Sequence, residues 1–154
     1  MKLKIPYISQ GKNSANCGPC SIKMLVDYYK INHPKGGKYT LPSLNRLLNV
    51  STEWGCEKSD MARVLNRVGL SRVKVEHHQI AWHLKNNGPI LSLLIDETGE
   101  GHYALISGKK GNTLYFHDSY FGKFYSRSMS FFKKQTKFFN HWLWAIYPKD
   151  STER

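Results

Sequence analysis

SANCGPCSIKMLVDYY, residues 14–29, decides the fold of this chain, because a polar loop changes there into an amphipathic helix. Four apolar residues recur at the spacing of a single helix face, namely Ile22, Leu25, Val26 and Tyr29. Pro19 fits the first helical position, where the missing N–H has no intrahelical partner to lose. The sequence therefore predicts a helix that carries Cys17 in its first turn.

Three further helices are predicted after this one, all before residue 89. A short helix follows Pro42, and the last of the three occupies residues 79–87. Between them, Ser59 is the expected N-cap of a helix that Gly69 ends. Ahead of the first helix, residues 1–10 begin with alternating apolar and polar side chains, which indicates a short strand or an extended arm.

From residue 89 onward the pattern changes to short apolar and aromatic runs separated by glycine-bearing turns. The predicted strands are residues 89–95, 102–108, 113–118, 123–126 and 142–147. Helices come first and antiparallel strands second, an order that is typical of the α+β class rather than of alternating βαβ units. At 154 residues, the chain suits a single domain, residues 1–154, with one packed interior.

The chain carries 23 Lys and Arg against 11 Asp and Glu, a formal net charge of +12. Such a surplus attracts anionic partners, but the basic residues are scattered and form no continuous helix face. Binding of nucleic acid or another polyanion therefore stays a minority hypothesis. No apolar run approaches the roughly 18 residues of a membrane helix, and no apolar block follows the basic N-terminus. We expect a cytoplasmic protein without a membrane span.

The three cysteines, Cys17, Cys20 and Cys56, are an odd number and do not indicate a disulfide framework. Cys17-Gly18-Pro19-Cys20 matches the thioredoxin tetrapeptide, which favours a dithiol redox site. In that fold, however, a strand, a helix and a second strand precede the motif, and only 16 residues precede Cys17 here. The redox hypothesis is kept as a secondary alternative. A metal site is not expected, because Cys56 has no His or Cys at the spacing of zinc ligands.

A nucleophilic thiolate is the stronger hypothesis for Cys17. The N–H groups and the positive dipole end of the helix favour the anion, and a nearby imidazolium favours it further. His102 opens a predicted strand and Asp118 ends the next one, so both side chains are expected at the same end of the sheet, where the carboxylate can orient the imidazole. Gln10 can supply an amide N–H that joins the Cys17 backbone N–H in an oxyanion hole.

Gln, Cys, His and Asp in this chain order resemble the papain-like cysteine peptidases. Four segments resemble the C39 and C39-like peptidases more closely: PYISQ at residues 6–10, NCGP at 16–19, GHYALISG at 101–108 and LYFHDS at 114–119. The resemblance implies a papain-like fold, in which an N-terminal helical half with the nucleophile at a helix N-terminus packs on a C-terminal antiparallel sheet. It also implies the site: Cys17 as nucleophile, His102 as general base and acid, Asp118 as the orienting residue and Gln10 as oxyanion donor.

The activity that the resemblance implies is hydrolysis of a peptide bond through a thioester acyl-enzyme on Cys17, without a metal or an organic cofactor. The implied partner is a polypeptide, and the leader-processing relatives cut after a Gly-Gly pair. The same triad serves transpeptidation and other acyl transfer, because formation of the acyl-enzyme does not determine which group accepts the acyl group afterwards. A non-catalytic peptide-binding module is the alternative, since some C39-like domains only hold a polypeptide.

Two residues depart from the family pattern. Members usually have Pro after the triad Asp, where this chain has Ser119, and a small non-thiol residue where it has Cys20. A serine can loosen the turn that aims Asp118. Cys20 lies three residues from Cys17, near enough for a disulfide that silences the nucleophile, although such a cysteine more often packs as a small apolar residue.

Overall fold

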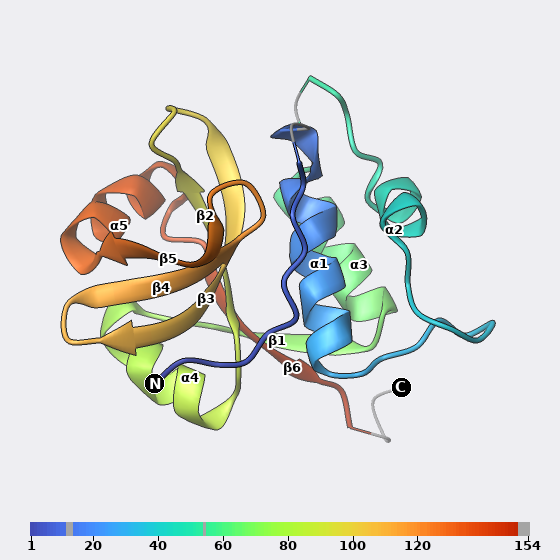
Figure 1. The fold of residues 1–154 in the computed structure, drawn as a ribbon, viewed down its shortest axis with the longest axis horizontal. Helices are drawn as coiled ribbons and strands as arrows, with labels where there is room; N and C mark the ends of the chain where they lie inside the picture. The colour runs from blue at the N-terminus through green and yellow to red at the C-terminus, as the bar shows by residue number, and fades with distance from the viewer. Residues whose placement is uncertain (12–13, 54, 151–154) are drawn as a thin grey trace.

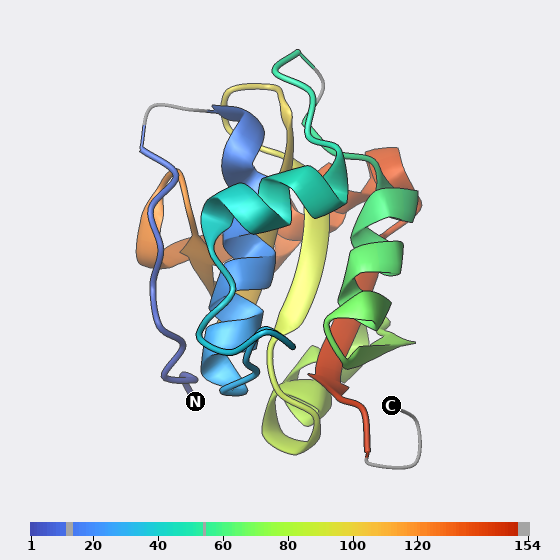
Figure 2. The ribbon, with the colours of Figure 1, turned by 90° about the vertical axis from the view of Figure 1, so that its right-hand side faces the viewer.

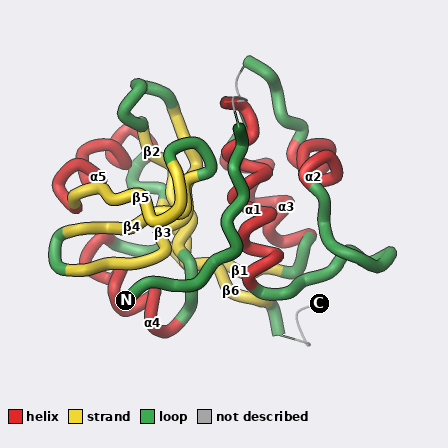
Figure 3. Tube along the Cα trace, in the orientation of Figure 1, coloured by secondary structure: helices red, strands yellow, loops and turns green. Residues whose placement is uncertain are grey.

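Three helices lie together on one side of the molecule, α1 at Cys17–Tyr28, α2 at Leu41–Leu48 and α3 at Lys58–Arg67. The structure, a computed structural model, describes residues 1–11, 14–53 and 55–150. Figure 1 and Figure 3 show these helices beside a six-stranded sheet, with α1 next to the sheet and α2 outermost. The arrangement confirms the predicted α+β class.

The sheet has the strand order β1-β6-β2-β3-β4-β5, and every neighbouring pair is antiparallel. Its strands are β1 (Leu70–Lys74), β2 (Ile90–Ile95), β3 (Gly101–Lys110), β4 (Thr113–Asp118), β5 (Gly122–Ser128) and β6 (Leu143–Pro148). Two more helices are α4 (Ile80–Asn86) and α5 (Met129–Thr136), and the short 3-10 turns are η1 (Ser14–Asn16), η2 (His77–Gln79) and η3 (Lys137–Phe139).

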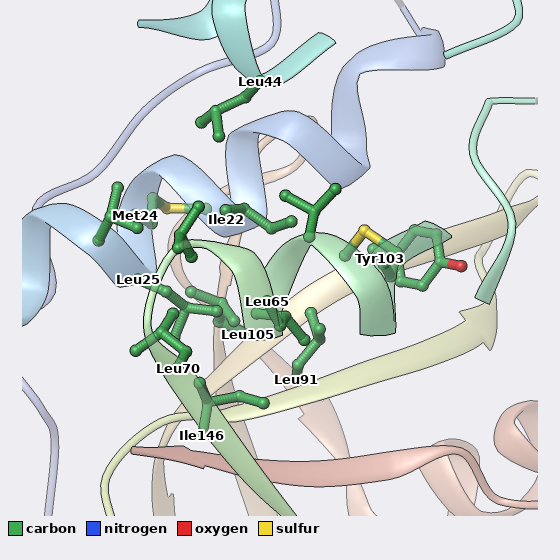
Figure 4. Packing of buried hydrophobic residues seen from close by; sticks show 14 of the residues in the cluster. Ile22, Met24, Leu25, Leu44, Leu65, Leu70, Leu91, Tyr103, Leu105 and Ile146 are labelled. Atoms are coloured by element: carbon green, nitrogen blue, oxygen red, sulfur yellow. The ribbon is translucent and has the colours of Figure 1, made fainter. Parts of the chain in front are cut away.

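Side chains of the central strands alternate between two hydrophobic cores, because successive residues of a strand point to opposite faces. In β3, Tyr103 and Leu105 belong to the core shared with α1, α2 and α3, whereas Ala104 and Ile106 belong to the core shared with α4 and α5. Figure 4 shows Leu105 among the labelled side chains of the first core. The sheet is thus a middle layer, and Figure 2 views it from the side of α2 and α3.

Predicted helix starts differ from the structure in α1, α2 and α3; α2 begins at Leu41 and so contains Pro42. Pro19 is the third residue of α1, not the first, because the helix already begins at Cys17. The first four N–H groups of a helix have no intrahelical acceptor, so proline fits anywhere in the first turn. Ser59 lies inside α3, which begins at Lys58 after Glu57, and it is therefore not the N-cap.

β1 and α5 are not predicted by the sequence. β1 pairs with a single neighbour at the edge of the sheet, and only its first residue is buried, so it lacks the apolar run that marks the other strands. α5 begins directly after β5 with no Gly or Pro between them. Its start depends on Ser128, whose hydroxyl accepts a hydrogen bond from Phe131 N at 3.1 Å.

Residues 1–10 form the predicted extended arm. Leu3 N donates to the carbonyl of Ser107 at 2.6 Å, and Gln10 N donates to the carbonyl of Ser119 at 2.8 Å. Figure 1 shows this arm running in front of the junction between α1 and the sheet. The arm therefore delivers Gln10 to the turn that follows β4.

Candidate active site

Cys17 is the first residue of α1, where the helix dipole is positive and backbone N–H groups have no intrahelical acceptor. Only 6% of the residue is exposed. It borders a cavity of about 690 Å³, and the wall of this cavity includes Leu93, Tyr103 and Phe139. A cavity of this size is typical of ligand sites. Cys17 thus lies at the side of a space that is large enough for a ligand.

β3 and β4 bring His102 and Asp118 together. His102 is the second residue of β3 and Asp118 is the last residue of β4, so antiparallel pairing puts both at the same end of the sheet. His102 Nε2 donates to Asp118 Oδ1 at 2.7 Å, and both side chains are buried. His117 points away from this pair, as strand alternation predicts, and its Nε2 hydrogen-bonds the carbonyl of Ile5 at 2.9 Å.

The surroundings of His102 favour its protonated form. Burial lowers the pKa of the imidazole, but hydrogen bonds to Asp118 and Cys17 and electrostatic interactions with the same two groups raise the pKa to about 10. Because Nε2 is bonded to Asp118, Nδ1 is the nitrogen that remains for Cys17. An imidazolium in this position stabilises a thiolate at Cys17.

Asp118 is completely buried and its two oxygens accept four hydrogen bonds. Oδ1 accepts from His102 and from the backbone N–H groups of Tyr120 and Phe121, while Oδ2 accepts from Arg127. Burial raises the pKa of the carboxyl group, but its bond to His102, the charges of His102 and Arg127 and the Phe121 N–H lower the pKa below its usual value. The carboxylate is thus held in place although Ser119 follows it.

Arg127 is a residue of this site that the sequence analysis missed. Nη2 of its buried guanidinium lies 2.9 Å from Asp118 Oδ2, and Nε lies 2.8 Å from Glu97 Oε1. Three aromatic rings also surround the guanidinium, those of Phe116, Phe121 and Tyr125. Nothing in the local sequence separates Arg127 from the other basic residues, because its position depends on β5 pairing beside β4.

Gln10 lies next to the other predicted site residues but is held by a different partner. Its side-chain Oε1 accepts a hydrogen bond from the hydroxyl of Ser119 at 2.5 Å, and both residues are buried. Gln10 and His102 also line a second cavity of about 210 Å³. The structure thus links Cys17, His102 and Asp118 by hydrogen bonds and sets Gln10 beside them.

All three cysteines are free thiols. Cys20 is fully buried and hydrogen-bonds Ser119, and burial and the charge of Cys17 raise the pKa of its thiol to about 12. Burial likewise raises the pKa of Cys56 to about 12, helped by the charge of Cys17. Cys56 packs against Gly18, where a Cβ would lie 2.3 Å from its sulfur. Gly18 is therefore needed for close contact between α1 and this thiol.

Candidate metal-binding groups and candidate membrane-spanning helices are both absent from the described part of the chain. Within residues 1–11, 14–53 and 55–150, no three His, Cys, Asp or Glu side chains are grouped so that they could hold a metal ion. In the same ranges, no helix has the length and the apolar character that a membrane crossing requires.

Solved structures of peptidase domains share this fold. A double glycine motif protease from an AMS/PCAT transporter, solved in complex with the leader peptide, is 20% identical over 96% of this chain and 94% of that chain, with a TM-score of 0.67. The peptidase domain of Streptococcus ComA, a bifunctional ABC transporter involved in quorum sensing, is 17% identical over 93% of this chain and 97% of that chain, with a TM-score of 0.70. At these identities the likeness concerns the fold.

A protein from Bacillus anthracis, described as a C39-like peptidase, is 12% identical over 98% of this chain and 99% of that chain, with a TM-score of 0.68. No curated protein sequence matches the chain. The sequence profile of the Peptidase_C39 like family matches residues 2–145, which include Gln10, Cys17, His102 and Asp118. The chain belongs to the Peptidase_C39 like family.

Proposed function

We propose that this chain is a cysteine peptidase that hydrolyses a peptide bond through a thioester on Cys17. The hydrogen-bonded series of Cys17, His102 and Asp118 is the observation that carries the proposal. Burial costs the imidazole and the carboxylate their hydration, and the hydrogen bond between them offsets this cost. Its contact with a thiol at a helix N-terminus matches the requirements of nucleophilic catalysis.

The reaction begins when the Cys17 sulfur attacks the carbonyl carbon of the scissile bond. A carbon–sulfur bond forms, and His102 gives its proton to the leaving amine nitrogen as the carbon–nitrogen bond breaks. Water then attacks the thioester, and its proton passes to His102 as the carbon–sulfur bond breaks. Asp118 keeps the imidazole oriented through both steps, because Nε2 stays bonded to Oδ1 while Nδ1 moves the proton.

Each attack places a negative charge on the carbonyl oxygen. We assign its stabilisation to the backbone N–H of Cys17 and the side-chain amide of Gln10. Gln10 is suited to this role because it is buried beside the cavity that His102 also lines. Buried, preoriented donors stabilise an oxyanion more than mobile ones, since they need no reorganisation during the reaction.

A polypeptide is the proposed substrate. The cavity of about 690 Å³ at Cys17 has space for several residues, and Leu93, Tyr103 and Phe139 give part of its wall an apolar character. The double glycine motif protease in the transporter was solved with the leader peptide bound. By analogy, peptides with a Gly-Gly pair are the first substrates to test.

The test combines cleavage with labelling of the thiol. Wild type, Cys17→Ala and His102→Ala are incubated with Gly-Gly peptides and with a mixed peptide library, and products are identified by mass spectrometry. Iodoacetamide labelling of each cysteine is followed from pH 5 to 9 in wild type and His102→Ala. We expect cleavage by wild type alone, and Cys17 labelling at pH 6 that slows at least tenfold without His102.

His78→Ala is the matched control, because His78 is an exposed histidine away from the triad. It should cleave and label as wild type does. If wild type cleaves no peptide and Cys17 labels only near pH 8.5, with or without His102, the peptidase proposal is wrong. Peptide binding under those conditions would instead indicate a non-catalytic binding module.

A further inference from the structure

Ser119 and Gln10 are joined at two points. The backbone N–H of Gln10 donates to the carbonyl of Ser119 at 2.8 Å. The hydroxyl of Ser119 donates to Gln10 Oε1 at 2.5 Å. Only 1% of Ser119 and 7% of Gln10 are exposed, so water competes little for either bond. The backbone bond sets the position of Gln10, and the side-chain bond acts on its amide group.

The side-chain bond determines which end of the Gln10 amide faces Ser119. Oε1 and Nε2 lie on opposite sides of the same planar group, so an Oε1 that accepts from Ser119 directs Nε2 away from it. A glutamine side chain has three rotatable bonds, so a hydrogen bond to Oε1 restricts the orientations that its amide adopts. An oxyanion donor is effective only when its N–H points at the developing charge.

Cys20 also lies against Ser119, from the side of α1. The Cys20 thiol is fully buried and hydrogen-bonds Ser119. The Ser119 hydroxyl donates its hydrogen to Gln10 Oε1. Cys20 is on the same helix as Cys17, so this series connects the nucleophile's helix to the arm that carries Gln10.

We propose that Ser119 is a positioning residue that holds the Gln10 amide with Nε2 directed to the oxyanion of the tetrahedral intermediate. This inference rests on the proposed peptidase function. Ser119 itself touches neither the substrate nor the reacting atoms. A proline at this position has no hydroxyl, so this role belongs to Ser119 and not to the residue that usually follows the triad Asp.

The experiment is a double-mutant cycle with Ser119→Ala and Gln10→Ala, measured as kcat and KM for a cleaved peptide. Ser119→Ala keeps the backbone bond to Gln10 and removes only the hydroxyl. We expect Ser119→Ala to lower kcat about tenfold and to leave KM unchanged. Gln10→Ala should lower kcat further, toward the 10²- to 10³-fold loss typical of an oxyanion donor. The double variant should be no slower than Gln10→Ala, because Ser119 acts through Gln10.

Labelling of Cys17 by iodoacetamide forms no oxyanion, so its rate should be unchanged in all three variants, which also shows that α1 and His102 are intact. Ser119→Thr, which keeps a hydroxyl, should recover most of kcat. Ser107→Ala is the matched control, since it removes another buried serine hydroxyl, one that donates to the Tyr115 carbonyl.

Three outcomes overturn the inference. Ser119→Ala with wild-type kcat shows that the hydroxyl is not needed. Equal losses from Ser119→Ala in the presence and absence of Gln10 show that Ser119 acts structurally. A wild-type chain that cleaves no peptide removes the proposed function and the inference with it, whereas cleavage by wild type with either of the first two outcomes removes the inference alone.

Discussion

Arg127 and Glu97 should shift the pKa of His102 in opposite directions. Arg127 bonds the far oxygen of Asp118, and Glu97 bonds Arg127, so the charges alternate in sign from His102 to Glu97. Arg127→Met removes a positive charge and should raise the pKa of His102 further above about 10. Glu97→Gln leaves the positive charge of Arg127 less compensated and should lower the pKa of His102.

The size of the effect of Arg127 on the pKa of His102 follows from the distance between these two cations. Arg127 lies 2.9 Å from one Asp118 oxygen and His102 lies 2.7 Å from the other. Across the carboxylate, the two cations are about 7 Å apart, and at an effective dielectric of about 20 their repulsion is roughly 2 kcal/mol. This corresponds to a shift of about 1.5 pKa units. Glu97 is farther away and its side chain is 32% exposed, so the opposite shift should be smaller.

The assay is an NMR titration of ¹⁵N-labelled histidine from pH 6 to 11, with the His102 signals assigned by their loss in His102→Ala. Arg63→Met is the matched control, because Arg63 pairs with Asp60 on the surface and should leave His102 unchanged. If both variants merely loosen the site, His102 separates from Asp118 and its pKa falls in each. A downward shift in Arg127→Met therefore refutes the electrostatic argument.

Two further predictions concern the thiols around α1. Burial raises the pKa of Cys20 and Cys56 to about 12, so iodoacetamide at pH 8 should label Cys17 alone in the folded chain. In urea it should label all three cysteines, which mass spectrometry would show. Labelling of Cys20 before unfolding would contradict this prediction. Gly18→Ala places a Cβ against the sulfur of Cys56 and should lower the free energy of unfolding in urea by about 1 to 2 kcal/mol. Adding Cys56→Ala should restore stability. A Gly18→Ala chain as stable as wild type would show that the Cys56 side chain moves aside at little cost.

Elements with a strong local pattern are predictable from this sequence. The buried residues of α1 include Ile22, Leu25 and Val26, which the helical spacing selects. β2 is buried over its first five residues, as its apolar run predicts. β1 and α5 are not predictable from the sequence, because their apolar residues are few or not periodic. Their formation depends on contacts with β6 and with the sheet. For such segments the tertiary contacts decide the structure.

The triad candidates could be selected from sequence because each stands at the end of a predictable element. Cys17 begins α1, while His102 and Asp118 lie at adjacent ends of β3 and β4, so element boundaries are sufficient to bring them together. Arg127 could not be selected, because its partner Glu97 is 30 residues away and lies in a loop. A residue whose role comes from a non-local ion pair has no local pattern to reveal it.

Ser119 shows how far a local argument can mislead. Considered with its neighbours alone, a serine after Asp118 weakens a turn that proline stiffens. In the fold, the turn is closed by two backbone N–H groups that bond Asp118 Oδ1, so proline is not needed there. The serine hydroxyl instead reaches Gln10, 109 residues away in the sequence. A departure from a family pattern can therefore be judged only against the contacts of its own fold.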